Sequence, residues 1–353
     1  MKKLQLSLLA LFVLVFAACS NGNATPATSG TPAQQVVNGF GTAQNHVHSL
    51  VILPDAQQTL VLATHYGIFR SQDHGAHWQE TAAGPNQLMQ GLMAYSLTYN
   101  PLNPQRLYVL TQIAVVPHPG VLGLYTSDDA GKTWQMSITT ASVTSSSIYF
   151  AHAGNDSPSQ VYIYLTNLGP NGLKVSTDNG AHFAQAGSQL PFGSLLGMLP
   201  IPGKPGHLLV YGNEGTASTS DDGQHWQVLK DIQDSIFEMT TAGAGQPIYA
   251  RGEAGIYASH NGGQSFTLVT QTSYASLTVS PQQPDMLYGK LALGVYRSSD
   301  GGKTWSPLPT IKGNLEVLVA DPNNAEQVYL ALSYPTGTYH FASNSWQSIT
   351  PPA

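Results

Sequence analysis

An eight-residue phrase occurs six times in this chain and constrains its fold more than any other feature. Each copy has a hydroxyl residue, then Asp or Asn two positions later, Gly two positions after that, and an aromatic residue at its end. The copies are residues 71–78, 127–134, 176–183, 219–226, 259–266 and 298–305. Their glycines are spaced about 40 to 55 residues apart, which is the length of one four-stranded propeller blade.

Each copy has the composition of a tight turn between two strands. Asp or Asn bonds to nearby amide groups, Gly adopts a positive φ, and the aromatic residue returns to a strand and buries its ring. We therefore expect structural roles for Asp73, Asp129, Asp178, Asp221, Asn261 and Asp300.

The first unit indicates a four-stranded meander, with strands at residues 49–53, 60–63, 68–70 and 77–81. The same order recurs in the later units, and a seventh unit ends in an incomplete copy of the phrase at residues 343–346. The sequence therefore predicts an all-β, seven-bladed β-propeller built of four-stranded antiparallel blades. An edge strand from residues 36–42, added to the last blade, is one way to close the ring.

A glycine also lies four residues before each phrase. We expect a left-handed turn between the second and third strands of each blade at these positions, which are Gly67, Gly123, Gly172, Gly215, Gly255 and Gly294.

The first residues resemble a bacterial lipoprotein signal. Lys2 and Lys3 precede an apolar run, and Cys19, the only cysteine, follows small residues at a position suited to cleavage and lipid attachment. We predict a signal peptide and lipobox over 1–19, a flexible tether over 20–42 and the propeller over 43–353, with the lipid holding the protein at the extracytoplasmic face of the cell envelope. The alternative is an ordinary secretory signal with an incidental cysteine.

Charge is scarce in this chain. Charged residues make up only 9%, and the formal net charge is -6. No basic run follows Lys2 and Lys3, which excludes the electrostatic footprint of a nucleic-acid-binding protein. We therefore expect a monomer whose partner is an extracellular peptide, protein or glycan.

Three histidines are candidate metal ligands. His46 and His48 lie on one side of an extended strand, and His65 lies on a turn at the same end of the propeller. Three imidazoles converging there would suit zinc or another borderline metal ion. The alternative is a polar lining of the central channel, and the sequence indicates no other cofactor.

Glu214 and Glu253 lie on neighbouring blades and are candidates for a pair of catalytic carboxylates. Retaining glycoside hydrolysis needs a separation of about 5 Å between such groups, and inverting hydrolysis about 6.5 to 9.5 Å. Glu238 and Glu316 lie near the innermost strands. The alternative is that these acids are solvated groups on turns.

The recurring phrase resembles the Asp-box of bacterial neuraminidase-type (BNR) repeat proteins. With residues 46–50 and 63–70 it is similar to the opening blade of bacterial glycosylhydrolase-like propellers, and more broadly to sortilin-type, photosystem II assembly factor and xyloglucanase propellers. The resemblance implies a shared fold, with the boxes away from any catalytic face, rather than a shared activity. Sialidases of this kind hold a substrate carboxylate with three arginines, and of the four arginines here only Arg251 is suitably placed.

Turns that differ between blades are where we expect function, because no packing rule dictates their residues. The main hypothesis is a surface-tethered binding module whose ligand contacts His65, Asn213, Arg251 and Glu253, beside the segment 111–122. One alternative is a glycoside hydrolase, of exo-sialidase or xyloglucanase type, that uses Glu214 and Glu253. Another is a metal-dependent protein that uses His46, His48 and His65.

Overall fold

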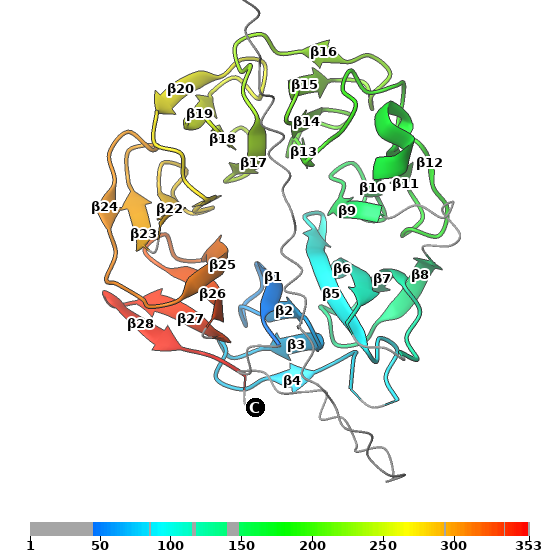
Figure 1. The fold of residues 1–353 in the computed structure, drawn as a ribbon, viewed down its shortest axis with the longest axis vertical. Helices are drawn as coiled ribbons and strands as arrows, with labels where there is room; N and C mark the ends of the chain where they lie inside the picture. The colour runs from blue at the N-terminus through cyan, green and yellow to red at the C-terminus, as the bar shows by residue number, and fades with distance from the viewer. Residues whose placement is uncertain are drawn as a thin grey trace, which may run out of the picture. The chain divides into compact units, whose positions relative to one another are not determined.

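The structure is a computed structural model that describes residues 45–84, 86–114, 118–139, 148–292, 294–334 and 336–351. Within these residues the chain forms seven sheets, and each sheet is an antiparallel meander of four strands in chain order. The sheets stand in a ring, with the first strand of each blade innermost (Figure 1). The predicted seven-bladed, all-β propeller is confirmed.

The first four blades contain sixteen strands. Blades 1 and 2 consist of β1 (Val47–Ile52), β2 (Leu60–Thr64), β3 (Gly67–Ser71), β4 (Gln79–Glu80), β5 (Leu92–Asn100), β6 (Asn103–Ile113), β7 (Gly123–Ser127) and β8 (Gln135–Thr139). Blades 3 and 4 consist of β9 (Ile148–Ala153), β10 (Val161–Leu165), β11 (Leu173–Ser176), β12 (Ala184–Gln185), β13 (Gly197–Pro200), β14 (Leu208–Gly212), β15 (Gly215–Thr219) and β16 (Gln227–Val228). A short 3-10 segment, η2 (Thr166–Asn171), lies between β10 and β11.

The last three blades contain twelve strands. Blade 5 consists of β17 (Ile236–Thr241), β18 (Ile248–Gly252), β19 (Ile256–Ser259) and β20 (Thr267–Thr270). Blades 6 and 7 consist of β21 (Ser276–Val279), β22 (Leu287–Leu291), β23 (Gly294–Ser298), β24 (Ser306–Pro307), β25 (Asn314–Ala320), β26 (Val328–Tyr334), β27 (Thr336–Ala342) and β28 (Ser345–Ser348). In the described part of the chain, no helix has the length and apolarity needed to cross a membrane.

The core consists of seven apolar clusters, each between two adjacent blades. Middle strands such as β2, β7 and β10 are buried along their whole length because both of their faces pack against neighbouring sheets. Each cluster receives one aromatic ring from the turn between the third and fourth strands, namely Trp78, Trp134, Phe183, Trp226, Phe266, Trp305 or Trp346. The expectation that this ring is buried holds fully for Phe266 and in part for the others.

All six recurring phrases form the same hydrogen-bonded turn, as predicted. The hydroxyl donates to the Asp or Asn Oδ1 at 2.7 to 2.9 Å and accepts the glycine N–H at 2.8 to 3.0 Å. That same Oδ1 accepts the N–H four residues further on, at 2.8 to 3.0 Å. The glycine φ lies between 80° and 89° in every copy, a conformation that glycine adopts without strain.

The ring closes by packing between blades 7 and 1. The cluster between them joins residues of β1 and β2 to Tyr329 and Ala331 of β26. Trp78 Nε1 donates to the Ile349 carbonyl oxygen at 2.7 Å, and Gln58 Nε2 donates to Asp321 Oδ1 at 2.7 Å. The predicted edge strand at residues 36–42 lies outside the described residues, as do Cys19, the signal peptide and the whole of the proposed tether.

Two local predictions are wrong. The left-handed turn expected at the glycine before each box is absent at Gly123, whose φ lies outside the left-handed region, and at Gly172, whose φ is -76°. Glycine is required at Gly172 by close approach, since a Cβ would lie 2.3 Å from the Leu165 carbonyl oxygen. Thr111 does not begin a loop but lies buried in β6, where its hydroxyl donates to the Gly123 carbonyl oxygen at 3.2 Å. Residues 115–117 of the same predicted loop are outside the described part.

Candidate functional site

The two ends of the ring carry different kinds of turn. In a four-stranded meander, the turn after the second strand and the connector to the next blade share one end, which we name the connector face. The Asp-box turns, between the third and fourth strands, share the other end, which we name the box face. His65, Asn213 and Glu253 follow β2, β14 and β18 respectively, so they lie on the connector face as expected.

The connector face does not gather all the predicted ligand-binding residues into one site. His65 belongs to blade 1, whereas Asn213 and Glu253 belong to blades 4 and 5, and β1 and β17 stand across the ring from each other (Figure 1). The structure therefore offers two separate candidate sites on this face.

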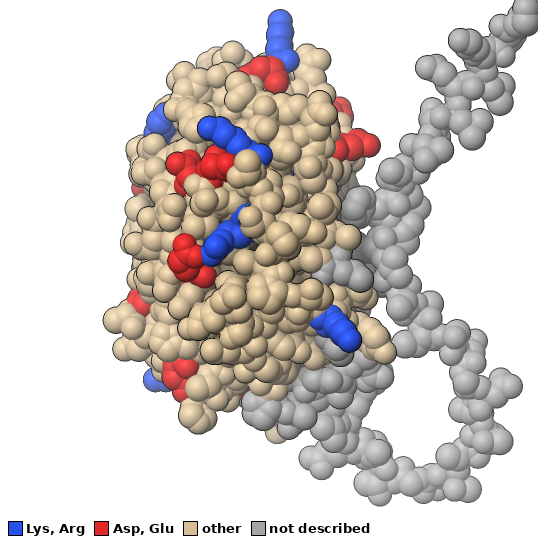
Figure 2. Space-filling view, turned by 90° about the vertical axis from the view of Figure 1, so that its left-hand side faces the viewer, with Lys and Arg blue, Asp and Glu red and all other residues tan. Residues whose placement is uncertain are grey.

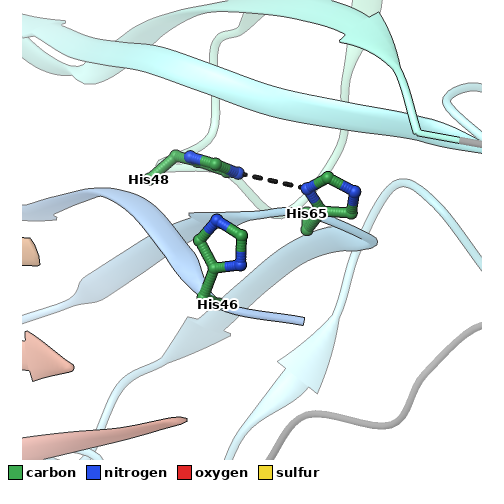
Figure 3. Close-up of side chains that lie close together, drawn as sticks. All are labelled: His46, His48 and His65. Carbon is green, nitrogen blue, oxygen red and sulfur yellow. Dashed lines mark hydrogen bonds between the residues drawn. The ribbon is translucent and has the colours of Figure 1, made fainter. Parts of the chain in front are cut away.

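The first candidate site is a cluster of the three predicted histidines. One side-chain nitrogen from each of His46, His48 and His65 lies within 4.8 Å of those of the other two. His48 Nε2 is 3.4 Å from His65 Nδ1, and the three rings turn toward one another (Figure 3). The predicted convergence is observed, while metal binding there stays a prediction.

The histidine cluster favours neutral imidazoles. Burial, with repulsion from His46 and His65, lowers the pKa of His48 to about 3. Burial and His46 also lower the pKa of His65. At neutral pH these two rings therefore present unprotonated nitrogens, the form that ligates metal ions or accepts hydrogen bonds.

The second candidate site is a pocket of about 400 Å³ between blades 4 and 5. Asn213 and Glu214 come from the turn between β14 and β15, Glu253 from the turn between β18 and β19, and Asp234 from the connector between the blades. The two glutamates are exposed, and Asp234 is half-buried. Three carboxylates thus line one small pocket.

Backbone donors fix two of these carboxylates. Glu214 Oε1 accepts the N–H groups of Gly193 at 2.9 Å and Ser194 at 3.2 Å. Asp234 Oδ2 accepts the Ala254 N–H at 2.9 Å. One oxygen of Glu214 is therefore engaged in holding the pocket wall, which leaves the other for a ligand, whereas the Asp234 side chain is also hydrogen-bonded to Tyr257.

Arg251 is held by neighbouring protein groups. Its Nε donates to Glu238 Oε2 at 3.1 Å, its Nη1 donates to the Tyr274 carbonyl oxygen at 3.3 Å, and its guanidinium lies 5.1 Å from the centre of the Phe237 ring. Burial raises the pKa of Glu238, although Arg251 acts in the opposite direction. This geometry supports a role for Arg251 in joining β17 to the next blade, and its predicted contact with a ligand stays untested.

The other three arginines, which lie in blades 1, 2 and 6, also have partners within the protein. Arg70 donates to the Ala130 carbonyl oxygen at 2.8 Å, Arg106 pairs with Asp128 at 2.6 Å, and Arg297 pairs with Glu326. All four arginines of the chain lie in its described part, and they do not converge as a three-arginine carboxylate clamp would require.

Sequence reasoning missed two features of the connector face. Asp234 lies in a connector without a repeated motif, so only its acidic side chain beside two turn glutamates could have drawn attention to it. The first strands of blades 1, 3, 5 and 7 also shift register near their beginning. These β-bulges place His48, Tyr149, Phe237 and Glu316 at comparable positions; the irregular pairing has no sequence signature of its own.

Charge is sparse on the outer side of the ring that lies on the left in Figure 1 and faces the viewer in Figure 2. Figure 2 shows basic and acidic groups scattered on a mostly uncharged surface, and neither sign forms a patch on that side. The three carboxylates in the pocket between blades 4 and 5 are therefore a local concentration of charge in a weakly charged protein.

Comparisons with known proteins agree with the fold. The family model named BNR/Asp-box repeat matches residues 125–136 and 296–307, which contain the complete boxes of blades 2 and 6. No curated protein matches the chain. The chain thus carries BNR/Asp-box repeats, as the sequence predicted.

Solved propellers of two kinds are similar in structure. A GH74 enzyme from Niastella koreensis has a TM-score of 0.67 and 16% identity, over 87% of this chain and 54% of the enzyme. YCF48 from Cyanidioschyzon merolae has a TM-score of 0.57 and 13% identity, over 81% of this chain and 92% of YCF48. YCF48 bound to D1 peptide has a TM-score of 0.56 and 11% identity, over 80% of this chain and 92% of that one.

This chain spans about half the length of the GH74 enzyme that it matches. At these identities the likeness concerns the fold alone. The protein is a seven-bladed β-propeller with BNR/Asp-box repeats, similar in architecture to both GH74 enzymes and YCF48.

Proposed function

We propose that this protein is a binding module that takes a peptide or protein segment with a basic side chain on its connector face. The observation that carries the proposal is the pocket between blades 4 and 5, where Glu214, Asp234 and Glu253 face one cavity of about 400 Å³. That volume lies within the range of small-ligand pockets. A Lys or Arg side chain supplies several N–H donors for carboxylate oxygens and offsets their mutual repulsion.

Apolar groups on the same face support a protein ligand over a sugar. Among the described residues, five of the exposed large apolar side chains lie at this end of the strands or in the connectors, namely Leu88, Ile113, Val121, Tyr149 and Tyr334. None of these residues lines the pocket, so they add apolar contact area elsewhere on the connector face. Apolar and aromatic side chains are typical of the centres of protein interfaces. The structure of YCF48 with a peptide shows that a propeller of this fold can bind one.

A glycoside hydrolase is the second candidate function. It is favoured by the fold shared with a GH74 enzyme and by the presence of Glu214 and Glu253 in one pocket. Such an enzyme needs one carboxylic acid that donates a proton and a second carboxylate. Both glutamates are exposed to solvent, and Glu214 is anchored by two backbone N–H groups, so they fit the binding role better.

An array of short peptides that vary in Lys and Arg content tests the proposal. We expect the full chain to bind basic peptides. The double variant Glu214→Gln/Glu253→Gln should bind them at least about 10-fold more weakly, and added salt should weaken binding further. Glu316→Gln is the matched control, because Glu316 is an exposed acid at the connector end of blade 7 and should leave binding unchanged. The proposal would be overturned if the affinity depended neither on the charge of the peptide nor on the double substitution.

The hydrolase alternative has its own readout. Release of reducing ends from xyloglucan or of sialic acid from a sialylated glycan, abolished in Glu253→Gln, would replace the binding role with catalysis. Absence of turnover together with retained binding of basic peptides would support the binding module.

We further propose that lipid attached to Cys19 tethers the module to the extracytoplasmic face of the cell envelope. The support is the order of charged, apolar and small residues before this cysteine. Metabolic labelling with a radioactive fatty acid should mark the wild-type protein and not Cys19→Ala. Equal labelling of both proteins would overturn the proposal.

A further inference from the structure

We propose that His46, His48 and His65 form a binding site for a divalent transition-metal ion, best suited to zinc, that leaves one coordination position open on the connector face. Three imidazole nitrogens within 4.8 Å of one another are the starting observation. Imidazole is a preferred ligand of zinc, copper and nickel, whereas calcium and magnesium prefer oxygen. The group consists of histidines alone, so the chemistry selects the first class of ion.

The backbone holds the three histidines in place. The His65 N–H donates to the His46 carbonyl oxygen at 3.0 Å, which sets the two residues opposite each other. The next pair of residues continues this link, because the Tyr66 N–H donates to Oδ1 of the buried Asn45 at 3.0 Å. The site is thus built on the first two strands of a packed blade, and little ordering is needed on binding.

The bulge in β1 brings His48 into the group. Val47 pairs with Thr64 and Ser49 pairs with Ala63, so His48 is the extra residue in the ladder. A bulge re-aims a side chain, and here the re-aimed ring turns toward His65 (Figure 3).

The separation of His48 from His65 fits two ligands of one ion. Two nitrogens bound to tetrahedral zinc at about 2.05 Å are about 3.3 Å apart. His48 Nε2 and His65 Nδ1 are 3.4 Å apart, which is long for a hydrogen bond. Since the largest separation within the group is 4.8 Å, closing the third ring onto the ion requires a shift of about 1.5 Å at most.

Packing does not explain why histidine occupies these positions. The bulges of blades 3, 5 and 7 carry Tyr149, Phe237 and Glu316 where blade 1 has His48. The fold therefore accepts aromatic and acidic side chains at this point of a blade. Three histidines together in blade 1 are better explained by a shared ligand than by architecture.

Three protein ligands leave a fourth position of a tetrahedral ion for water or an incoming donor. Each of the three histidines is half-buried, so the ion would sit at the surface of the connector face and not in a closed structural site. This arrangement suits an ion that binds a donor atom of another molecule. It does not depend on the acidic pocket across the ring.

Zinc titration of the full chain, purified without a polyhistidine tag and stripped with chelator, tests the proposal by calorimetry. We expect one ion per chain, and single variants His48→Ala and His65→Gln should weaken binding by more than the ~10- to 100-fold that loss of a supporting group costs. The matched control is His77→Ala, because His77 lies in the first box with its side chain 90% exposed and bonded to Asp73. This control should bind zinc as the wild type does.

Cobalt substitution separates coordination from loss of folding. Wild-type protein with one equivalent of Co²⁺ should show the strong visible absorption of a four-coordinate ion, and the histidine variants should lose it while keeping the wild-type circular dichroism spectrum. No stoichiometric zinc binding by the wild type would overturn the proposal, as would equal loss of binding in His77→Ala.

Discussion

The two ends of the propeller use similar residues in opposite ways. On the box face, His77 Nδ1 donates to Asp73 Oδ2 at 2.6 Å, and His182 and His225 repeat the same bond with Asp178 and Asp221. Among the described residues of the connector face, the cluster of His46, His48 and His65 includes no carboxylate, and the pocket of Glu214, Asp234 and Glu253 is lined by no basic group. The repeated hydroxyl, carboxylate and amide groups of the box turns are paired with one another, whereas we propose that the two connector-face clusters are positioned for a ligand.

Repetition explains this difference. The box turns recur because each blade must be joined to the previous one, and a turn that does so in one blade does so in the next. The turns of the connector face do not have this structural role, so their residues differ between blades and are available to bind a ligand. The comparison predicts large losses of stability when a box-face substitution removes a ring packed between blades, and small losses for exposed connector-face substitutions.

The largest effect is expected for Trp78→Ala. Trp78 packs in the cluster that closes the ring and donates to the Ile349 carbonyl oxygen, 271 residues away in the chain. Its loss should reduce the free energy of unfolding by about 3 kcal/mol, as in other truncations of large buried side chains. Urea denaturation followed by fluorescence or circular dichroism measures this change.

Leu88→Ala is the matched control for ring closure. Leu88 is 43% exposed in the connector after blade 1, and its truncation should change stability by no more than about 0.5 kcal/mol. If the two substitutions cost the same, the proposed division between the faces does not hold.

A buried imidazole gives the next largest effect, and it depends on pH. His340 stacks on Tyr329, with ring centres 4.1 Å apart, and its Nε2 lies 3.0 Å from Gln327 Oε1. Burial, with a smaller contribution from His74, lowers the pKa of His340 to about 4 from 6.5. The unfolded chain therefore binds more protons between these pH values, so stability is complete above pH 6.5 and declines as the pH falls toward 4.

His340→Phe removes this titration and keeps an aromatic ring against Tyr329. From pH 7 to pH 4.5, the wild type should lose about 2 kcal/mol of stability more than the variant. His77→Phe is the control on the box face, because the exposed His77 ring adds little to the folded core. Identical pH profiles for wild type and His340→Phe would show that this imidazole does not sense acid.

The fold was predictable because its signal is repeated. Six copies of one turn fix the position of the third and fourth strands in six blades, and each copy supports the others. The sequence also holds a second repeat, a tyrosine in the second strand of five blades. Tyr108, Tyr162, Tyr249, Tyr288 and Tyr329 are all buried there.

The candidate sites were predictable only in part. His46, His48 and His65 are close in the chain and on one blade, so strand geometry was enough to bring them together. The acidic pocket depends on how blade 5 stands against blade 4, and Asp234 enters it from a connector of irregular structure. Likewise, the sequence does not indicate a partner for Arg251, whereas the pairing of β17 with β18 places Glu238 beside it. Contacts that arise between blades have no short-range sequence signal.

The smallest effects are expected from substitutions in the box itself, and the box of blade 5 indicates what to expect. Asp129 Oδ1 accepts the Thr133 N–H at 2.8 Å, and Oδ2 accepts its hydroxyl at 2.6 Å. In blade 5, Asn261 takes the place of the aspartate. Its Oδ1 accepts the Ser265 N–H at 3.0 Å, and its Nδ2 donates to the Ser265 hydroxyl at 2.7 Å. Asp129→Asn should therefore be nearly neutral, whereas Asp129→Ala should cost about 1 kcal/mol in unfolding free energy.

Thermal unfolding of the two variants beside the wild type decides whether the box acts through its shape or its charge. The hydrogen bonds to Oδ1 survive in Asp129→Asn, and the hydroxyl of Thr133 can turn to accept from Nδ2 as that of Ser265 does. A loss in Asp129→Asn as large as that in Asp129→Ala would mean that the negative charge itself stabilises the turn. Carboxylate charge would then matter on both faces. The two faces would differ only in how far their polar groups are buried.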